Sequence, residues 1–369
     1  MGFVGNQFTW KRGRRQVSFV AKRLVRVLCC PHSRLRWQAA KVTHLPFLAS
    51  DHAPLYLQLE PELGMNARRR PFRFEAAWLS HPGFQDLVDI SWNRQLQTRE
   101  ALTNLRKVLI RWNKEVFGEV QVRKEKLLGE LKLVQEEIEL TQTDELLNKE
   151  AVLLKEFDTV LEQEEVIWFQ KSREKWVVSG DKNTKYFHTT TIIRRRRNRI
   201  DMLRDDDGSW VSNGSDLENL AITYFKRLYS LDDVDQIVER LPSQGFVQLS
   251  QEDQIGLSTP FSAAEVESEI RSMGKYKAPG PDGFQPVFYH HCWDVVGESV
   301  IRFVLDFFGS GVLPQDTNDA MVVLIPKVAK PERITQFRPI SLCNVLFKTI
   351  TKTMVSRLKG VMSKLIGPA

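Results

Sequence analysis

The stretch MVVLIPKVAKPERITQFRPISLCNVLFKTITKTMVSRL, residues 321–358, decides how the rest of the chain is interpreted. It begins with the apolar run VVLI (322–325), which Pro326 ends, and this pattern predicts a short buried strand followed by a turn. After a polar loop come FRPI (337–340) and then apolar residues at helical spacing up to residue 358. Lys327 and Arg338 therefore lie at strand and turn positions, where both can make charge-assisted contacts with a triphosphate. Two solvated surface charges are the alternative interpretation.

A turn rich in Gly and Pro, KAPGPDG (277–283), lies upstream of this stretch. A rigid turn of this kind can present backbone N–H groups and the Lys277 ammonium to a polyanion. Together with LIPK (324–327) and FRPISLCNVLFK (337–348), it resembles the fingers segment of the reverse transcriptase of a LINE-type, non-LTR retrotransposon, most closely the plant elements. The resemblance implies that residues 215–369 form the N-terminal, fingers part of such a domain. We therefore interpret Lys327 and Arg338 as nucleotide-binding and Lys277 as nucleic-acid-binding.

The composition fits a polyanionic partner. The 369 residues carry 53 Lys and Arg against 46 Asp and Glu, a formal net charge of +7, and the length suffices for two or three domains. Cys29, Cys30, Cys292 and Cys343 show no metal-ligand spacing and are typical of reduced intracellular thiols. No apolar run approaches the roughly 18 residues of a membrane span, and the N-terminus lacks a signal-peptide pattern. We expect an intracellular chain without a membrane partner.

Residues 1–60 predict short strands and turns. FTW (8–10), RLVR (23–26) and SDH (50–52) resemble the last part of a retrotransposon endonuclease of the endonuclease/exonuclease/phosphatase type. The resemblance implies that His52, beside Asp51, assisted phosphodiester hydrolysis. An imidazole needs a hydrogen-bonded partner to fix its tautomer, and the family's orienting carboxylate is replaced by Val25. We expect Asp51 and His52 to be a catalytically inactive remnant, because the family's other catalytic residues have no counterpart in this chain.

Residues 61–99 are expected to be a connector, in which the phrase FRFEAAW (72–78) is again similar to the retrotransposon family. Its basic run, Arg68 to Arg70, is interpreted as a solvated linker or, alternatively, as a phosphate contact. Residues 100–178 predict a hairpin of two charged helices separated by TQTD (141–144), with Thr143 or Asp144 capping the second helix. The predicted apolar stripes are Leu127, Leu131, Val134 and Ile138 on the first helix, and Leu147, Leu154, Leu161 and Trp168 on the second. A structural spacer is the simplest interpretation, and self-association through the hairpin is the other.

The strongest nucleic-acid signal lies in residues 168–214, which begin WFQKSREKWVVSGDKNTKYFHTTTIIRRRRNR. Cations that neutralise phosphates alternate there with aromatic rings on which unpaired bases stack. The candidate RNA-binding residues are Lys171, Arg173, Lys175, Trp176, Lys182, Lys185, Tyr186, Phe187, His188, Arg194, Arg195, Arg196, Arg197 and Arg199. The sequence of this segment is similar to the segment that precedes the polymerase in plant LINE proteins, and this resemblance implies contact with template RNA. Packing of Trp168 and Trp176 on the hairpin is the competing interpretation, and the arginine run also suits nuclear import.

Polymerisation of nucleotides uses two divalent ions held by carboxylates. In reverse transcriptases these carboxylates belong to an early Asp motif and to a later Tyr-x-Asp-Asp motif. No Tyr-x-Asp-Asp motif occurs in the 369 residues. Asp205 to Asp207 in DDDGSW are expected to be turn residues before a hairpin at Gly208, not metal ligands. We therefore expect no metal and no cofactor in this fragment, although Mg²⁺ serves the intact family enzyme.

The predicted fold class is α+β and mostly α: a partial endonuclease β-sandwich tail, a long helical hairpin and incomplete reverse-transcriptase fingers. The predicted function is a fragment of a non-LTR retrotransposon RNA-directed DNA polymerase, whose parental role is target-primed reverse transcription and which is catalytically inactive alone. RNA, and DNA as a second candidate, are the expected partners, in the nucleus. The alternative is a co-opted RNA-binding or interaction protein without enzymatic activity.

Overall fold

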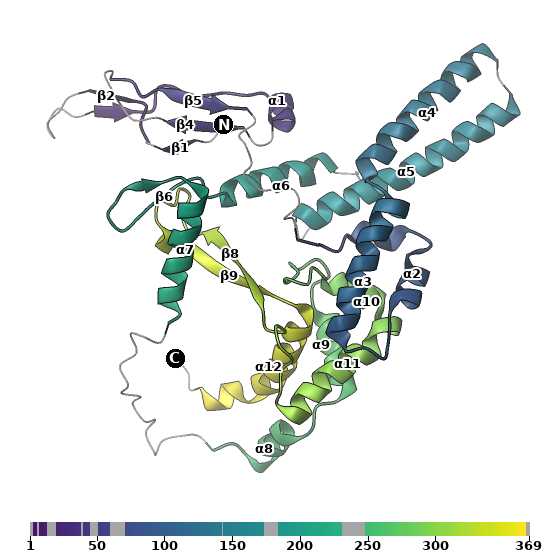
Figure 1. Ribbon diagram of the computed structural model, residues 1–369, viewed down its shortest axis with the longest axis vertical. Helices are drawn as coiled ribbons and strands as arrows, with labels where there is room; N and C mark the ends of the chain where they lie inside the picture. Colours follow the sequence, from purple (N-terminus) through teal and green to yellow (C-terminus); the bar gives the residue numbers. More distant parts are fainter. Residues whose placement is uncertain are drawn as a thin grey trace. The chain divides into compact units, whose positions relative to one another are not determined.

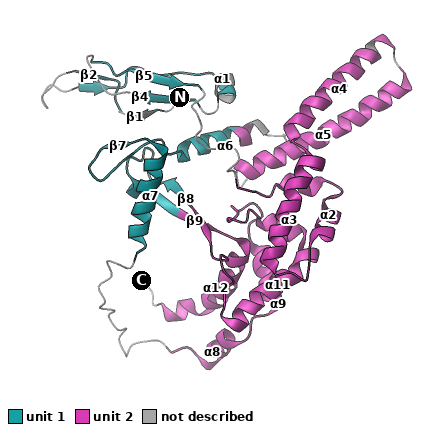
Figure 2. Ribbon diagram, viewed as in Figure 1, with its two compact units in different colours: residues 1–70, 189–236, 324–339 teal, residues 71–188, 237–323, 340–369 magenta. Residues whose placement is uncertain are grey.

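The computed structural model describes residues 3–5, 7–12, 20–37, 40–44, 51–59, 71–141, 143–172, 184–230 and 248–366. The chain divides into two compact units (Figure 2). The first unit comprises residues 1–70, 189–236 and 324–339, and the second comprises residues 71–188, 237–323 and 340–369. Long helices dominate and the sheets are small, so the prediction of a mostly α, α+β chain is confirmed.

The N-terminal part of the first unit consists of short strands. Strand β1 (Val4–Gly5) pairs parallel with β4 (Lys41–His44), and β4 pairs antiparallel with β5 (Leu55–Gln58). A separate antiparallel pair joins β2 (Trp10–Arg12) to β3 (Val20–Lys22), and α1 (Pro31–Arg36) lies between β3 and β4 in the chain. Short strands are thus present among the described residues, as predicted, whereas Ser50 of the SDH motif lies outside the described residues. The endonuclease fold itself stays a prediction.

The remainder of the first unit packs around a small core. It contains most of α6 (Thr184–Asn198), the hairpin of β6 (Leu203–Arg204) and β7 (Trp210–Val211), α7 (Gly214–Leu228) and the 3₁₀ turn η4 (Ile334–Gln336). Leu203, Ile334 and Phe337 are buried there against one face of α7. The turn expected at Gly208 is confirmed, because Gly208 adopts a φ of +84° between β6 and β7.

The second unit contains the predicted hairpin. Helix α3 (Thr98–Trp112) continues through the π turn η3 (Asn113–Phe117) to α4 (Val120–Leu140), and α5 (Asp144–Ser172) returns alongside α4 (Figure 1). The predicted cap is present, since the backbone N of Leu146 donates to Thr143 Oγ1 at 3.3 Å. Leu127, Leu131 and Val134 are buried and Ile138 packs against them, so the stripe predicted on the first helix is confirmed.

The stripe predicted on the second helix is wrong by one residue. Leu153, Val160 and Ile167 are the buried apolar residues of α5, whereas Leu154 remains 45% exposed. Both registers repeat every seven residues, so apolar spacing alone does not distinguish them. Polar contacts fix the register, because Gln163 and Glu164, next to the buried positions, bind Arg123 and Lys124 of α4.

The rest of the second unit is a helical core. Its elements are η2 (Ala76–Ser80), α2 (Phe84–Ser91), α8 (Gln251–Ser258), α9 (Ala263–Ser272), α10 (Pro286–His291), α11 (Trp293–Ser310) and α12 (Val345–Leu365). Ser262 and Glu265 form a capping box at the start of α9. Helices α10 and α11 meet at Cys292, which ends the first and precedes the second.

Residues 71–92 differ from the connector expected there. Phe74, Trp78, Phe84 and Val88 are each at most 3% exposed and belong to the main core. Pro and Gly in this segment are typical of a linker, but its aromatic side chains pack on α3 and on Phe284 and Phe288. The segment is therefore structural rather than connecting.

Strands β8 (Ala320–Pro326) and β9 (Phe337–Cys343) form a two-stranded sheet. Residues 324–339, which close this hairpin, belong to the first unit, and the strand residues outside that range belong to the second. Asn344 follows β9 directly and is the N-cap residue of α12. Strand β8 agrees with the strand predicted over 322–325, and β9 replaces the turn expected at FRPI.

Candidate nucleic-acid interface

The KAPGPDG turn is held by two segments of the second unit that are far from it in the sequence. Asn344 Oδ1 accepts a hydrogen bond from the backbone N of Asp282 at 3.1 Å, and Lys348 Nζ donates to Ala278 O at 3.1 Å. The backbone N of Phe74 donates to Gly283 O at 3.0 Å. The phrases FRFE, KAPGPDG and SLCN, which are separated by about 60 to 200 residues of chain, therefore meet at one place.

Two glycines make this close approach possible. A Cβ at Gly280 would lie 2.4 Å from both the backbone N and Oδ1 of Asn344. A Cβ at Gly283 would lie 2.3 Å from Phe72 O, and Gly283 also has a φ of +83°. No other residue fits either position without displacing backbone. The glycines of KAPGPDG are thus explained by packing.

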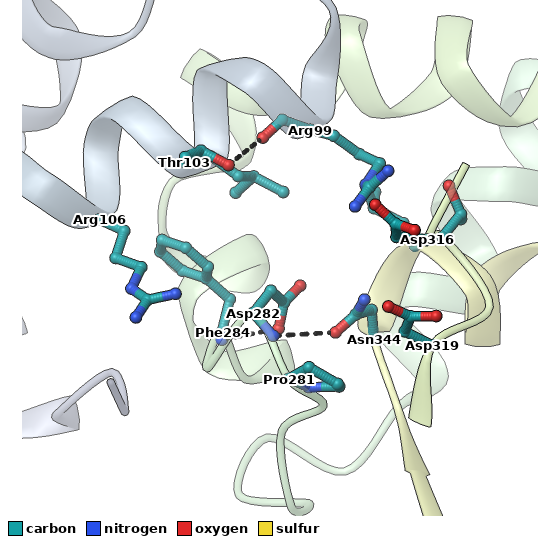
Figure 3. A pocket seen from close by; sticks show the side chains of 12 residues that line it. Arg99, Thr103, Arg106, Pro281, Asp282, Phe284, Asp316, Asp319 and Asn344 are labelled. Atoms are coloured by element: carbon teal, nitrogen blue, oxygen red, sulfur yellow. Dashed lines mark hydrogen bonds between the residues drawn. The ribbon is translucent and has the colours of Figure 1, made fainter. Parts of the chain in front are cut away.

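A cavity of about 200 Å³ opens beside the turn (Figure 3). Helix α3 provides Arg99, Leu102, Thr103 and Arg106; the turn provides Pro281, Asp282 and Phe284; the loop before β8 provides Asp316, Thr317 and Asp319; and α12 provides Leu346 next to Asn344. Every one of these residues belongs to the second unit. The cavity therefore places two guanidinium groups and three carboxylates around one small space.

Asp282 is the most perturbed acid of the cavity. Burial raises its pKa to about 6, and the backbone N–H of Phe284, with the charges of Lys348, Arg99 and Arg106, opposes part of that rise. The Phe284 N–H donates to Asp282 Oδ1 at 3.0 Å. Burial likewise raises the pKa of Tyr289, whose hydroxyl has no hydrogen-bond partner. A further hydrogen-bond donor to the Asp282 carboxylate would therefore stabilise its charged form.

The two predicted nucleotide-binding cations lie on the β8–β9 hairpin. Lys327 is exposed, and its Nζ donates to Thr335 O at 2.8 Å across the loop. Arg338 is exposed on β9. Both belong to the first unit, whereas Lys277 belongs to the second, where Gln285 Nε2 donates to its carbonyl at 3.0 Å. The nucleotide-binding role of Lys327 and Arg338 stays a prediction.

The basic aromatic segment is only partly described. Arg173, Lys175, Trp176 and Lys182, together with the side chain of Lys185, lie outside the described residues. Phe187 is 3% exposed and packs against Phe169, while His188 contacts the ring of Trp168 at 4.0 Å between centroids. Lys171 also lies over the Trp168 ring, at 5.2 Å. The aromatic rings that are described therefore pack largely on α5, which is the competing interpretation given above.

Tyr186 and the arginine run are the accessible part of this segment. Tyr186 is 50% exposed, and the side chains of Arg195 and Arg197 are exposed on α6. Arg194 and Arg196 are half-buried, and Arg199 pairs with Asp201 at 2.9 Å. These side chains can reach a phosphate backbone, and their RNA-binding role stays a prediction.

The remnant residues Asp51 and His52 lie beside β2. Trp10 Nε1 donates to Asp51 Oδ2 at 2.8 Å, and His52 forms a β-bridge with Trp10. Val25 uses its backbone N to donate to the Thr9 hydroxyl at 3.0 Å. Within the described ranges, no three His, Cys, Asp or Glu side chains are grouped so that they could hold a metal ion. The inactivity of this remnant stays a prediction.

Sequence reasoning missed Arg99, Arg106, Asp282 and Asn344. Nothing in the pattern of α3 distinguishes Arg99 and Arg106 from other exposed cations of an amphipathic helix, although their spacing of seven places them on one face. Asn344 could have been identified as an N-cap residue, since it follows a strand and precedes a helix.

None of the helices in the described part of the chain has the length and apolarity that a membrane crossing requires.

Two comparisons bear on the origin of the chain. It is 25% identical over 358 residues to the transposon TX1 uncharacterized 149 kDa protein of Xenopus laevis, a match that covers 94% of this chain and 27% of that protein. It is 26% identical over 204 residues to the probable RNA-directed DNA polymerase from transposon X-element of Drosophila melanogaster, which covers 53% of this chain and 22% of that protein. No protein-family model matches. The chain thus spans about a quarter of the length of these curated relatives, and the similarity supports a transposon origin.

Proposed function

We propose that this chain is the part of a non-LTR, LINE-type retrotransposon polyprotein that joins the tail of an endonuclease to the fingers of a reverse transcriptase. The parental activity is target-primed reverse transcription, in which a nicked DNA end primes copying of the element's RNA. The contribution of these 369 residues is to bind RNA. Similarity to a probable RNA-directed DNA polymerase over 53% of the chain supports the assignment, as does similarity to an uncharacterized transposon protein over 94% of the chain.

The observation that carries the proposal is the convergence at the KAPGPDG turn. Three motifs that resemble retrotransposon proteins, two of them from the reverse transcriptase and one from the connector before it, pack against one another through Phe74, Gly280, Gly283 and Asn344. A functional polymerase segment needs such a rigid framework, because its contacts with template and nucleotide must be held in place. Short sequence motifs that matched the family by accident would not be expected to pack against one another in the fold.

RNA binding is proposed to reside in the cations of residues 171–199 and in Lys277. Exposed Arg195 and Arg197 on α6, with Tyr186, offer phosphate contacts and a stacking surface. Lys327 and Arg338 are proposed to bind a nucleoside triphosphate. The Tyr-x-Asp-Asp carboxylates that hold catalytic metals do not occur in these residues. We therefore propose that the 369 residues alone do not polymerise.

The test is the salt dependence of RNA binding. A fluorescent single-stranded RNA of 20 nucleotides is titrated with the 369-residue protein, and the association constant is plotted against salt concentration on logarithmic axes. Each phosphate contact in single strands adds about 0.7 to the slope. The variant R195Q/R197Q is expected to lower the slope by about 1.4, because it removes two such contacts.

A matched control removes two exposed cations elsewhere. Lys126 and Lys132 of α4 have side chains that are 75% and 76% exposed, so K126Q/K132Q changes the net charge equally and is expected to leave the slope unchanged. Equal losses in the two variants would show non-specific attraction and contradict the proposal. Primer extension with Mg²⁺ and deoxynucleotides is expected to give no product with the same protein.

A further inference from the structure

The cavity beside the KAPGPDG turn carries polar groups that the fold itself leaves unused. Thr317 is fully buried in its wall, and its hydroxyl has no hydrogen-bond partner. The neighbouring Asp316 adopts a φ of +58°, which is rare for a residue with a Cβ. Strained backbone and unpaired buried groups concentrate at functional sites.

Donors and acceptors reach this cavity from different segments of the second unit. Arg99 and Arg106 come from α3, whereas Asp282, Asp316 and Asp319 come from the turn and the loop before β8 (Figure 3). Arg99 Nη1 donates to Gln315 O, which leaves part of its guanidinium available. Among the described residues, the Arg106 guanidinium contacts only the face of Phe72, at 5.6 Å, and Asp282 Oδ2 accepts no hydrogen bond.

The balance of charge restricts the ligand. Three carboxylates are balanced by two guanidinium groups and by the nearby Lys348 ammonium, so a phosphate would meet no excess of positive charge. The guanidinium groups disfavour a metal ion for the same reason. A neutral molecule with hydrogen-bond acceptors on one edge and donors on another satisfies both walls. A cavity of about 200 Å³ has room for a purine.

We propose that this cavity binds a guanine base of single-stranded RNA. The inference rests on the proposed function, because the chain must bind RNA for a base to be delivered there. Guanine presents the acceptors O6 and N7 on one edge and the donors N1–H and N2–H₂ on another. The other bases match less well. Adenine carries a donor and an acceptor together on its N6/N7 edge, and the pyrimidines carry both kinds of group on a single edge.

The roles of the residues follow from the walls they occupy. Arg106 donates to O6 and N7, as arginine commonly does when it reads guanine. Asp282 accepts from N1–H and N2–H₂, and these donors supply the partner that its desolvated carboxylate lacks. Thr317, which also lines the cavity, offers a hydroxyl that has no hydrogen-bond partner. The rigid turn, locked by Asn344, holds Asp282 in position before the base arrives.

The experiment compares RNAs of twelve uridines with one central guanosine, inosine or adenosine, each titrated with the 369-residue protein by fluorescence anisotropy. Inosine lacks only the N2 amino group. Guanosine-containing RNA is expected to bind about tenfold tighter than the inosine RNA, because inosine lacks one of the two donors to the Asp282 carboxylate. D282N is expected to remove this preference, whereas R106Q, which faces the O6 and N7 that inosine shares with guanosine, is expected to remove the preference of both RNAs over the adenosine RNA.

The control is D306N, which neutralises an exposed acid on α11 and is expected to keep the full preference. Asn at position 282 can still accept from the Phe284 N–H, so the turn is preserved; if circular dichroism shows that D282N is unfolded, R106Q decides alone. Three results overturn the proposal: equal affinity for the guanosine and inosine RNAs, a preference for guanosine over inosine that survives D282N, or a preference for guanosine over adenosine that survives R106Q.

Failure of the proposed function gives a different result. If no RNA binds in a salt-dependent manner, the RNA-binding assignment fails, and guanosine itself is then titrated and followed by the NMR spectrum of the protein. Guanosine binding that R106Q abolishes supports a guanine site that takes a free nucleoside. Absence of guanosine binding overturns the site as well.

Discussion

At the scale of single residues, glycine positions differ in what they contribute. Gly280 is required by a close approach of two backbones, because its position leaves no space for a Cβ beside Asn344. Gly129 lies inside α4 with nothing within 4 Å of an added Cβ. The same chemical change should therefore have opposite effects at the two positions.

We expect G280A to lower the free energy of unfolding by more than about 2 kcal/mol, since it forces backbone apart at the turn. G129A is expected to raise it by about 0.5–1 kcal/mol, because alanine restricts the unfolded chain and favours the helix. Urea unfolding followed by far-ultraviolet circular dichroism measures both. Similar effects of the two substitutions would contradict the packing assigned to Gly280.

Glu265 gives the fold a defined dependence on pH. Arg357 donates to both of its carboxylate oxygens, at 2.7 and 2.8 Å, and together with Ser262 it lowers the pKa of Glu265 to about 2. A lowered carboxylate pKa means that the stabilisation is present above pH 4.5 and is lost as the pH falls from 4.5 toward 2. The pair joins α9 to α12.

We expect E265Q to lose about 1 kcal/mol of stability at pH 7, a value reduced by the partial exposure of the pair, and to lose progressively less relative to wild type below pH 4. Thermal unfolding between pH 2 and 7 measures the difference. E267Q on the same helix serves as the control for removing an acid. A constant difference between E265Q and wild type over this range would contradict the assignment.

At the scale of elements, the hairpin tests which heptad of α5 is buried. Val160 is fully buried, whereas Leu154 is 45% exposed, although both are apolar and lie on the same helix. Leu154 belongs to the stripe predicted from the sequence, and Val160 belongs to the stripe that the structure buries. A charge at each position separates the two registers.

V160D is expected to lower the free energy of unfolding by more than about 3 kcal/mol, because it buries an unpaired charge between α4 and α5. L154D is expected to cost less than about 1 kcal/mol, because the side chain stays in water. Chemical denaturation followed at 222 nm compares the variants. A larger loss in L154D would show that the register inferred from the sequence is the true one.

Sequence patterns predict the individual helices and strands better than the contacts between them. Periodicity identified the hairpin and the stripe on α4, and the Ser262 capping box marked the start of α9, because these signals are local. The α5 register escaped prediction because Arg123 and Lys124, on another helix, select it. Pro and Gly near Phe74 indicated a connector, whereas burial depends on α3 and Phe284, which no local pattern shows.

At the scale of the whole molecule, each unit is assembled from three separate segments of chain. The motifs that resemble reverse transcriptases can be recognised in the sequence, but the cavity that they help to form cannot be predicted from it. Arg99 and Arg106 come from a helix that the resemblance did not include, and only tertiary packing brings them beside Asp282. Lys327 and Arg338 were foreseen as a pair, and the structure places them on one hairpin of the first unit.

The central claim is that these residues bind RNA as the fingers part of a retrotransposon polymerase. Photocrosslinking to RNA that contains 4-thiouridine, followed by mass spectrometry of the crosslinked peptides, tests it most directly. We expect crosslinks within residues 171–199, at the KAPGPDG turn and on the β8–β9 hairpin. They should fall as salt is raised. Crosslinks confined to α4 and to the strands of residues 3–59, or none above background, would contradict the claim.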